Sequence, residues 1–480
     1  MSATASFEPI TKERQQSAGY KFETLGNATL QLFEGDKPVL ATDPWLEGTC
    51  YFGSWGLDHA LTPDQIRNVC ESRFIWISHG HPDHLHLESL KLIPRDPGPR
   101  ILIPHHYSNE IEEYLKDEGF PVQVLQFKQW ARLTPTLRLM CLEDLNQDAM
   151  LIIEAGDTLI INQNDALPFG KEPFLRRLVS RYKKTYLLSS CAMNTDMFNY
   201  IDKEGKPLRP SPEEAKAMVI RGRGDFCNYL RIQNYCCSAF QQLFIRADSK
   251  WANAYRVSLD DLKRHWNSSA RLIEPFATVN TEDGSVTRNH PSQETDMSQV
   301  TDQTGEDNWD DRMTEEEWQK LEAFVHKFTI LETEVDFIGF TVGGESRTYY
   351  LKNKSNPRPE KQRGVNFLVP KNSLMETVKY GYFDDLLIGN FMKTQLINMR
   401  LYPKFSPYIA KFGGNAKVFA RPQLIKFYFH YFKLSPIAFV RSDLQSLWTY
   451  KLKPASWRMV RKLGIARAMK ATTRWLKIPH

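Results

Sequence analysis

The chain has 480 residues, 41% of them hydrophobic, and a formal net charge of +5, so it is long enough for more than one hydrophobic core and we expect at least two domains. It contains no apolar run of about 18 residues, which excludes an ordinary transmembrane helix. Its first residues form neither a basic leader nor an apolar core, and its seven cysteines are odd in number, so we expect a cytoplasmic protein with free thiols.

Along the chain, residues 1–15 are polar, and the first segment that dictates a chemistry is 78–84, directly after a short apolar β-type run. This segment contains three imidazoles and one carboxylate: His79, His81, Asp83 and His84. Neutral imidazole suits zinc and iron, and the aspartate adds charge and an oxygen ligand. Because Pro82 stiffens the turn and directs Asp83 and His84 away from His81, the spacing favours two metal ions over one.

Carboxylates, and no histidines, follow the motif over a long stretch of the chain. No histidine lies between His106 and His265. Just before the predicted strand at 150–154, the chain has Glu143, Asp144 and Asp148. A carboxylate ligand suits iron or manganese better than zinc. The next predicted strand, from residue 158, leads to Asp165.

The histidine motif resembles the His-x-His-x-Asp-His signature of the metallo-β-lactamase superfamily. Segments 22–32 and 39–46, with an Asp-Pro-Trp turn, are similar to the opening hairpin of its lactonase-like branch, and 149–165 is similar to a later strand pair. The turn and the long C-terminal extension look most like CMP-N-acetylneuraminate hydroxylase-type proteins, although the paired Cys and His spacings of a Rieske cluster are absent. The resemblance implies an α/β protein with a four-layer αββα catalytic domain over residues 16–275. It also implies two divalent metal ions, bridged by Asp165.

The resemblance further implies a ligand set. Family members supply a third histidine where this chain has its three carboxylates, and there we expect Asp148 to bind. They supply a last histidine near 244–248, where Asp248 or His265 could compensate. The predicted metal ligands are His79, His81, Asp83, His84, Asp148 and Asp165, and the predicted catalytic residues are Asp83 and Asp165. The ions would be zinc or iron, with manganese also possible, and the alternative is a site that holds one ion or has degenerated.

Three functions follow from such a site. The first is hydrolysis of a charged small molecule that bears a phosphate, nucleotide or carboxylate, by a metal-activated water. The second is hydroxylation by a non-haem diiron oxygenase that resembles CMP-N-acetylneuraminate hydroxylase and takes electrons from another protein. The third is a degenerate metal-binding module with a tail that associates with a membrane or nucleic acid.

The chain changes character after the first domain. Residues 279–312 are polar and acidic, which predicts a flexible linker. Residues 313–480 are predicted to form an α+β region, which starts with a helix capped by Thr314 and Glu317.

Two adjacent carboxylates in this region have two possible roles. Asp384 and Asp385 follow an aromatic residue and precede an apolar run. Aspartate is favoured at helix starts, so they are predicted to cap a helix. The alternative is that they place a carboxylate pair in the active site.

The end of the chain is strongly basic. From Phe391 to His480 there are 18 Lys and Arg residues and one acidic residue, Asp443, so this part carries +17 and the rest of the chain −12. Apolar and cationic residues at 457–476 partly follow helical spacing, which predicts a basic amphipathic helix. Such a helix could lie peripherally on an anionic membrane, steer a small anionic substrate, or dock on the protein with a solvated basic face. Nucleic acid binding is less favoured.

Overall fold

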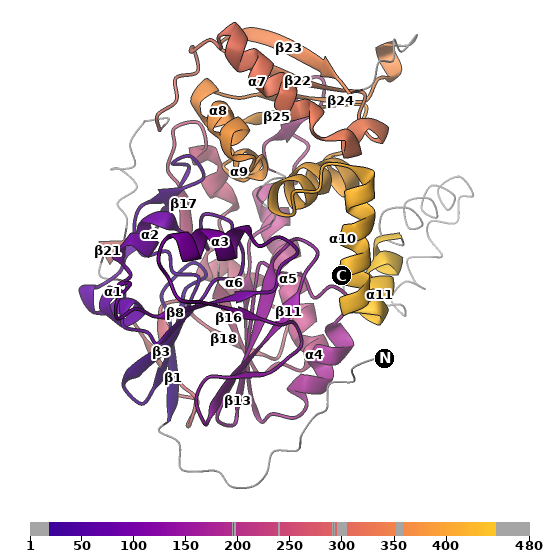
Figure 1. The fold of residues 1–480 in the computed structure, drawn as a ribbon. Helices are drawn as coiled ribbons and strands as arrows, with labels where there is room; N and C mark the ends of the chain where they lie inside the picture. The colour runs from indigo at the N-terminus through magenta and orange to yellow at the C-terminus, as the bar shows by residue number, and fades with distance from the viewer. Residues whose placement is uncertain are drawn as a thin grey trace.

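The computed structural model describes residues 19–447, except 194, 196–197, 239–240, 290, 292, 295–304 and 352–358. The predicted tail helix at 457–476 lies outside the described residues. Two large sheets form the first part of the molecule, and a third sheet forms the second part (Figure 1). Among the residues described, none of the helices combines the length and apolarity needed to cross a bilayer.

The first large sheet has eight strands in the order β20-β19-β1-β2-β3-β7-β8-β9. The strands β3, β7, β8 and β9 are parallel neighbours, and the others pair antiparallel. Their bounds are β1 Tyr20–Thr24, β2 Leu30–Glu34, β3 Lys37–Thr42, β7 Phe74–Trp76, β8 Arg100–Pro104, β9 Val122–Leu125, β19 Ala277–Asn280 and β20 Val286–Arg288.

The second large sheet has seven strands in the order β10-β11-β12-β13-β14-β16-β18, and it changes from antiparallel to parallel pairing at β13. Their bounds are β10 Ala131–Arg132, β11 Leu137–Glu143, β12 Ala149–Ala155, β13 Thr158–Asn164, β14 Lys184–Ser190, β16 Asn234–Ser238 and β18 Arg271–Ile273. Short strands β4 Thr49–Cys50, β5 Trp55–Leu57 and β17 Gln242–Phe244 form a small sheet, and β6 His59–Ala60 pairs with β21 Gln293–Glu294.

Side-chain alternation along the strands builds four layers. In β12, Leu151 and Ile153 face the core between the two sheets, whereas Met150 and Ile152 face the opposite side. That opposite side is covered by α4 Glu172–Val179, α5 Pro212–Leu230 and α6 Leu259–His265, and the outer face of the first sheet by α1 Pro63–Cys70, α2 Leu87–Leu92 and α3 Glu110–Asp117. The predicted αββα fold is therefore confirmed.

The second part is α+β, as expected. Its sheet has the order β15-β25-β24-β22-β23, with β22 Phe337–Val342, β23 Glu345–Tyr350, β24 Gly364–Leu368 and β25 Lys393–Ile397. The helices are α7 Glu315–His326, α8 Lys371–Tyr380, α9 Asp384–Ile388, α10 Arg421–Leu434 and α11 Pro436–Leu447, with π-helical turns at Leu401–Phe405 and Tyr408–Asn415. Helix α7 begins at the predicted capping box, in which Thr314 accepts from the Glu317 backbone.

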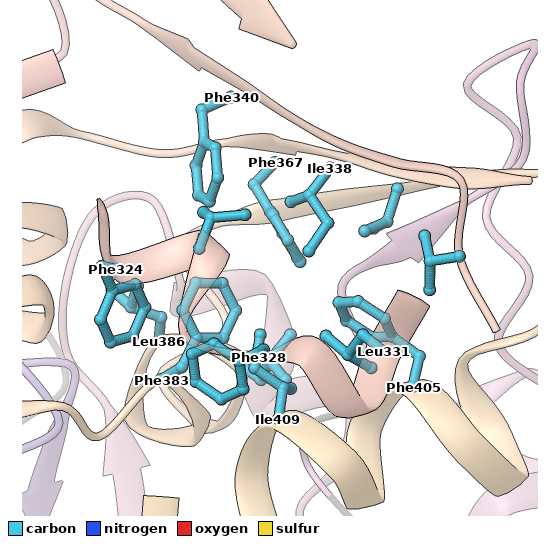
Figure 2. Close-up of a cluster of buried hydrophobic side chains, with 14 of the residues drawn as sticks. Phe324, Phe328, Leu331, Ile338, Phe340, Phe367, Phe383, Leu386, Phe405 and Ile409 are labelled. Carbon is cyan, nitrogen blue, oxygen red and sulfur yellow. The ribbon is translucent and has the colours of Figure 1, made fainter. Parts of the chain in front are cut away.

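A buried aromatic cluster holds these helices to the sheet. Figure 2 shows Phe340 and Phe367 from the strands above Phe324, Phe383 and Leu386 from the helices. The rings of Phe367 and Phe383 lie 4.9 Å apart between centroids, edge to face. Helix α9 is thereby fixed at the side of the cluster that faces the first part of the molecule (Figure 1).

The boundary between the two parts differs from the prediction. The expected linker, 279–312, contains β20 in the first sheet, and its Asp307 makes a buried ion pair of 2.8 Å with Arg246. The strand β15 Tyr200–Ile201 comes from the first part but pairs with β25 of the second. Residues 290, 292 and 295–304 of the expected linker lie outside the described residues, and in the described part pairing with an existing sheet edge and one buried cation order a polar chain.

Candidate metal centre

The histidine motif lies where strands of the two large sheets end. Asp43 follows β3, the motif follows β7, and Asp165 follows β13. Asp43 and Asn164 adopt positive φ values of 40° and 56°, a conformation that Asp and Asn tolerate better than most residues. The Ser78 backbone N–H donates to Asp43 Oδ1 at 2.7 Å, which ties the start of the motif to the neighbouring strand end.

One set of ligand atoms gathers around His79. Its Nε2 atom lies 2.9 Å from His81 Nδ1 and 3.8 Å from Asp148 Oδ1. Asp148 Oδ1 is buried without a hydrogen-bond partner. Two imidazole nitrogens and a buried carboxylate oxygen thus lie close together around His79 Nε2, and one proton cannot satisfy all three.

A second set gathers around His84. Its Nε2 atom lies 3.3 Å from Asp83 Oδ2 and 3.3 Å from Asp165 Oδ2, yet it is buried without a well-directed hydrogen bond. Metal–ligand bonds of about 2.0–2.2 Å in tetrahedral geometry separate the ligand atoms by about 3.3–3.5 Å. The rings of His79 and His84 lie 4.1 Å apart between centroids, so the two sets are adjacent. Among the described residues, His79, His84 and Asp165 each offer one ligand atom within 4.8 Å of the other two, so these three side chains could hold a metal ion.

Outer contacts orient these ligands. His81 Nε2 lies 3.0 Å from Asp384 Oδ2, and the Tyr51 hydroxyl donates to Asp83 Oδ1 at 2.5 Å. His84 Nδ1 lies 3.4 Å from Asp43 Oδ2. In each case the outer partner holds one end of the side chain and leaves the other end directed at the ligand set, as is usual around protein-bound metals.

Comparisons with known proteins give matches over part of the chain. No family model matches the chain. Over 167 residues, 33% of this chain, it is 30% identical to cytidine monophosphate-N-acetylneuraminic acid hydroxylase from Macaca mulatta, and over 176 residues it is 26% identical to that of Danio rerio. These matches span only 28% and 30% of the relatives' own lengths. The four layers of the first part, the position of the histidine motif after β7 and the matched relatives together identify the fold. The chain has the metallo-β-lactamase fold.

Solved structures give looser matches. An isothiocyanate hydrolase from Delia radicum gut bacteria is 14% identical over 56% of this chain and 99% of its own, with a TM-score of 0.37. CmlA, a diiron β-hydroxylase from Streptomyces venezuelae, is 13% identical over 56% of this chain and 55% of its own, with the same TM-score. These TM-scores are too low to support a fold assignment, which rests on the two large sheets and the histidine motif.

Of the three carboxylates considered for the third ligand of this metallo-β-lactamase fold, only Asp148 lies at the histidines. Asp144 accepts a hydrogen bond from the Leu167 backbone at 2.8 Å, and Glu143 lies 3.5 Å from the Lys171 ammonium. The loop between β11 and β12 thus contributes one candidate ligand. All six predicted ligands lie close together around His79 and His84, with Asp165 the most exposed at 35% of its side chain.

The suggested replacements for the last histidine are elsewhere. Asp248 pairs with Arg246 at 2.8 Å, and His265 lies 2.9 Å from Glu213 Oε1. The prediction that either could compensate was therefore wrong. No charged partner that would identify them as structural residues could be read from the sequence, because Glu213 and His265 meet only after α5 and α6 pack together.

The capping interpretation of the Asp384–Asp385 pair was also wrong. Helix α9 has Phe383 at its N-cap and no side-chain capping hydrogen bond. Asp384 instead contacts His81, as the alternative in the sequence analysis proposed. Its other oxygen, Oδ1, is buried without a hydrogen-bond partner.

Burial and neighbouring charges shift the pKa values of His79 and His81 in opposite directions. Burial, together with neighbouring imidazoles, holds the pKa of His79 well below its usual value. Burial would also lower the pKa of His81, but the hydrogen bond and charge of Asp384 outweigh it and raise that pKa to about 10. Burial and the nearby Asp144 charge raise the pKa of Asp148 well above its usual value. The anionic form of such a buried carboxyl group is unfavourable by itself, and a bound cation stabilises it.

Two site residues escaped the sequence analysis. Tyr51 lies in a loop with no motif of its own, and Lys411 lies in the π-helical turn Tyr408–Asn415. Burial lowers the pKa of Lys411, and the charges of Asp144 and Asp148 act against that effect. No local pattern marks either residue, because each reaches the site through long-range packing.

Proposed function

We propose that this protein is a dinuclear metal-dependent hydroxylase acting on a small anionic molecule. The observation that carries the proposal is the position of Asp148, which gives the centre three carboxylates beside three imidazoles. An oxygen-rich set of this kind favours iron over zinc. The relatives that match a third of the chain are named as hydroxylases, which supports the same choice.

In this proposal each side chain of the site has its own role. When bound, a pair of iron ions would supply dioxygen activation, whereas zinc would supply a water of lowered pKa. Asp384 holds His81, and Tyr51 holds Asp83, so that both ligands keep one orientation. The Lys411 ammonium, beside Asp148, would pair with a negative group on the substrate. Hydroxylation with dioxygen also consumes two electrons and two protons, so an electron-donor protein would be needed.

Hydrolysis is the second candidate. It uses the same six side chains, but needs only water as the second reactant. The set around His84, with imidazole and two carboxylates at zinc-compatible spacing, is the observation that favours it.

The metal content of the protein and the substitution of one ligand distinguish hydroxylation from hydrolysis. We expect protein purified without chelators to contain iron, and Asp148→His to shift the bound metal towards zinc, because it replaces oxygen with nitrogen ligation. The matched control is Asp157→His in the exposed turn after β12, which should keep the wild-type metal ratio. Zinc without iron in the wild-type protein would contradict the hydroxylase proposal and leave hydrolysis.

His79→Ala and Asp165→Ala should abolish turnover by either enzyme, whereas a binding module would tolerate both.

A further inference from the structure

The helix α10 is apolar on both of its faces. Phe427 and Tyr431 are fully buried, and Phe427 packs edge to face on Tyr107 at 5.1 Å. On the opposite side Ile425, Phe429 and Phe432 are 69%, 55% and 40% exposed. Their spacing of four and then three residues places them on one helical face. Large apolar side chains gathered on an exposed face mark an interaction surface.

The helix α11 continues this pattern. Ile437, Val440 and Leu444 are 76%, 48% and 60% exposed, at spacings of three and four residues. Phe439 faces the other way and contacts Phe169 at 6.0 Å between ring centroids. The two helices lie side by side at the edge of the molecule (Figure 1). We name these six exposed side chains the apolar stripe: Ile425, Phe429, Phe432, Ile437, Val440 and Leu444.

Cations accompany the apolar stripe. Arg421, Lys426 and Lys433 are exposed on α10, and the Lys433 ammonium lies 4.3 Å from the Phe429 ring centroid. Asp443 is the one acidic residue between positions 391 and 480. Residues 448–480, which follow α11 directly, add nine Lys and Arg residues to this composition. The apolar stripe therefore stands in a strongly positive part of the chain.

We propose that the apolar stripe docks on a membrane surface that contains anionic lipids. Large apolar side chains beside lysines and arginines are the composition of helices that lie in the interface of a bilayer. The acyl region accepts the apolar side chains, and the negative headgroups accept the cations. A second copy of the chain, or its own basic end, would bring cations against cations on the same face. This proposal is independent of the reaction at the metal centre.

Vesicle co-sedimentation with the full chain tests the proposal. We expect binding to phosphatidylcholine vesicles with about 30% phosphatidylserine, weaker binding to phosphatidylcholine alone, and a decrease as salt is added. The double variant Phe429→Ser, Ile437→Ser should bind roughly tenfold or more weakly, because it removes two large apolar contacts. The matched control, Leu208→Ser with Met218→Ser, changes two side chains that are 45% and 59% exposed on other segments and should bind like wild type.

Several outcomes would overturn the proposal. Absence of wild-type binding to anionic vesicles is one, and unchanged binding of the Phe429→Ser, Ile437→Ser variant is another, since other parts of the chain would then make the contact. A wild-type dimer in sedimentation velocity that this variant dissociates would assign the stripe to contacts between copies. Equal thermal unfolding of wild type and both double variants verifies that folding is not the cause.

Discussion

His81 connects the histidine motif with a helix that lies three hundred positions further along the chain. Its Nδ1 atom faces His79 Nε2 at 2.9 Å, and its Nε2 atom faces Asp384 at 3.0 Å. A carboxylate behind a ligating imidazole fixes the ring orientation and raises its basicity. The second part of the molecule therefore contacts the candidate metal centre directly through Asp384.

Replacement of Asp384 tests this contact. We expect Asp384→Asn to weaken metal affinity about 10–100-fold, because an amide orients the ring without the charge of a carboxylate. The measurement is a competitive metal titration of the apoprotein. Asp385→Asn is the matched control, since Asp385 is adjacent but makes no hydrogen bond to His81, and it should change affinity much less. Equal effects of both variants would mean that overall charge matters and the hydrogen bond does not.

Metal uptake should depend on pH through the same histidine. The pKa of His81 is raised to about 10 without metal, mainly because the hydrogen bond and charge of Asp384 overcome its burial. At neutral pH a metal must then displace a proton from Nδ1, so affinity should rise with pH up to about that pKa. Calorimetric titration in two buffers with different ionisation enthalpies measures the protons released. Uptake without proton release would contradict the expected protonation of His81.

The six candidate ligands could be proposed from sequence because four of them lie in one motif and the other two follow or precede apolar strands. Tyr51 and Lys411 could not, since no local pattern marks them. The two possible roles of Asp384 could be named but not decided, because an aspartate before an apolar run suits both a helix start and an active site and only tertiary packing chooses between them. Asp248 illustrates the same limit. Its pairing with Arg246 and Trp309 is a property of the folded chain.

At the scale of elements, α9 is a five-residue helix that packing holds in place. Phe383, Leu386 and Leu387 are fully buried in the cluster of Figure 2, on both sides of Asp384 in the sequence. A helix this short is not stable by itself. The position of the Asp384 carboxylate is thus determined by the apolar side chains around it.

Loss of one of these side chains should affect both stability and the site. Phe383→Ala is expected to lower the free energy of unfolding by about 3–5 kcal/mol, the usual cost of emptying a buried phenylalanine site. It should also weaken metal binding, because α9 loses its anchor. Denaturant unfolding and metal titration measure the two effects. Tyr380→Ala, which removes a 54% exposed ring from the end of α8, should change neither.

Element prediction succeeded where local signals and packing agree. The capping box at Thr314 and the continuous apolar runs of β12 and β13 are local patterns that the fold uses directly. The described part of segment 279–312 departs from the linker prediction at β20, whose sequence Val-Thr-Arg is polar and becomes a strand by pairing with β19. Edge strands of this kind take their structure from a neighbour that composition cannot reveal.

At the scale of the whole molecule, the two parts are interlocked. Strand β15 pairs with β25, Arg246 is paired with Asp307, and the Gln147 side-chain amide donates to the Tyr431 hydroxyl of α10. Gln147 immediately precedes Asp148 in the loop that reaches His79. The second part is therefore a support for the metal centre as well as an appended domain.

Truncation tests whether the first part can hold the centre alone. A chain that ends at Arg312 loses Asp384, Lys411, the partner of β15 and the apolar cover of Leu145 and Phe169. We expect it to aggregate or to bind an apolar dye, and to retain little metal, because buried apolar surface becomes exposed and His81 loses its carboxylate. A chain that ends at Leu447 keeps every contact described above and should match the full chain in metal affinity and unfolding. Size-exclusion chromatography, dye binding and metal titration compare the three chains. A monomeric chain of 312 residues with full metal affinity would show that the metallo-β-lactamase domain is independent and that the Asp384 contact is dispensable.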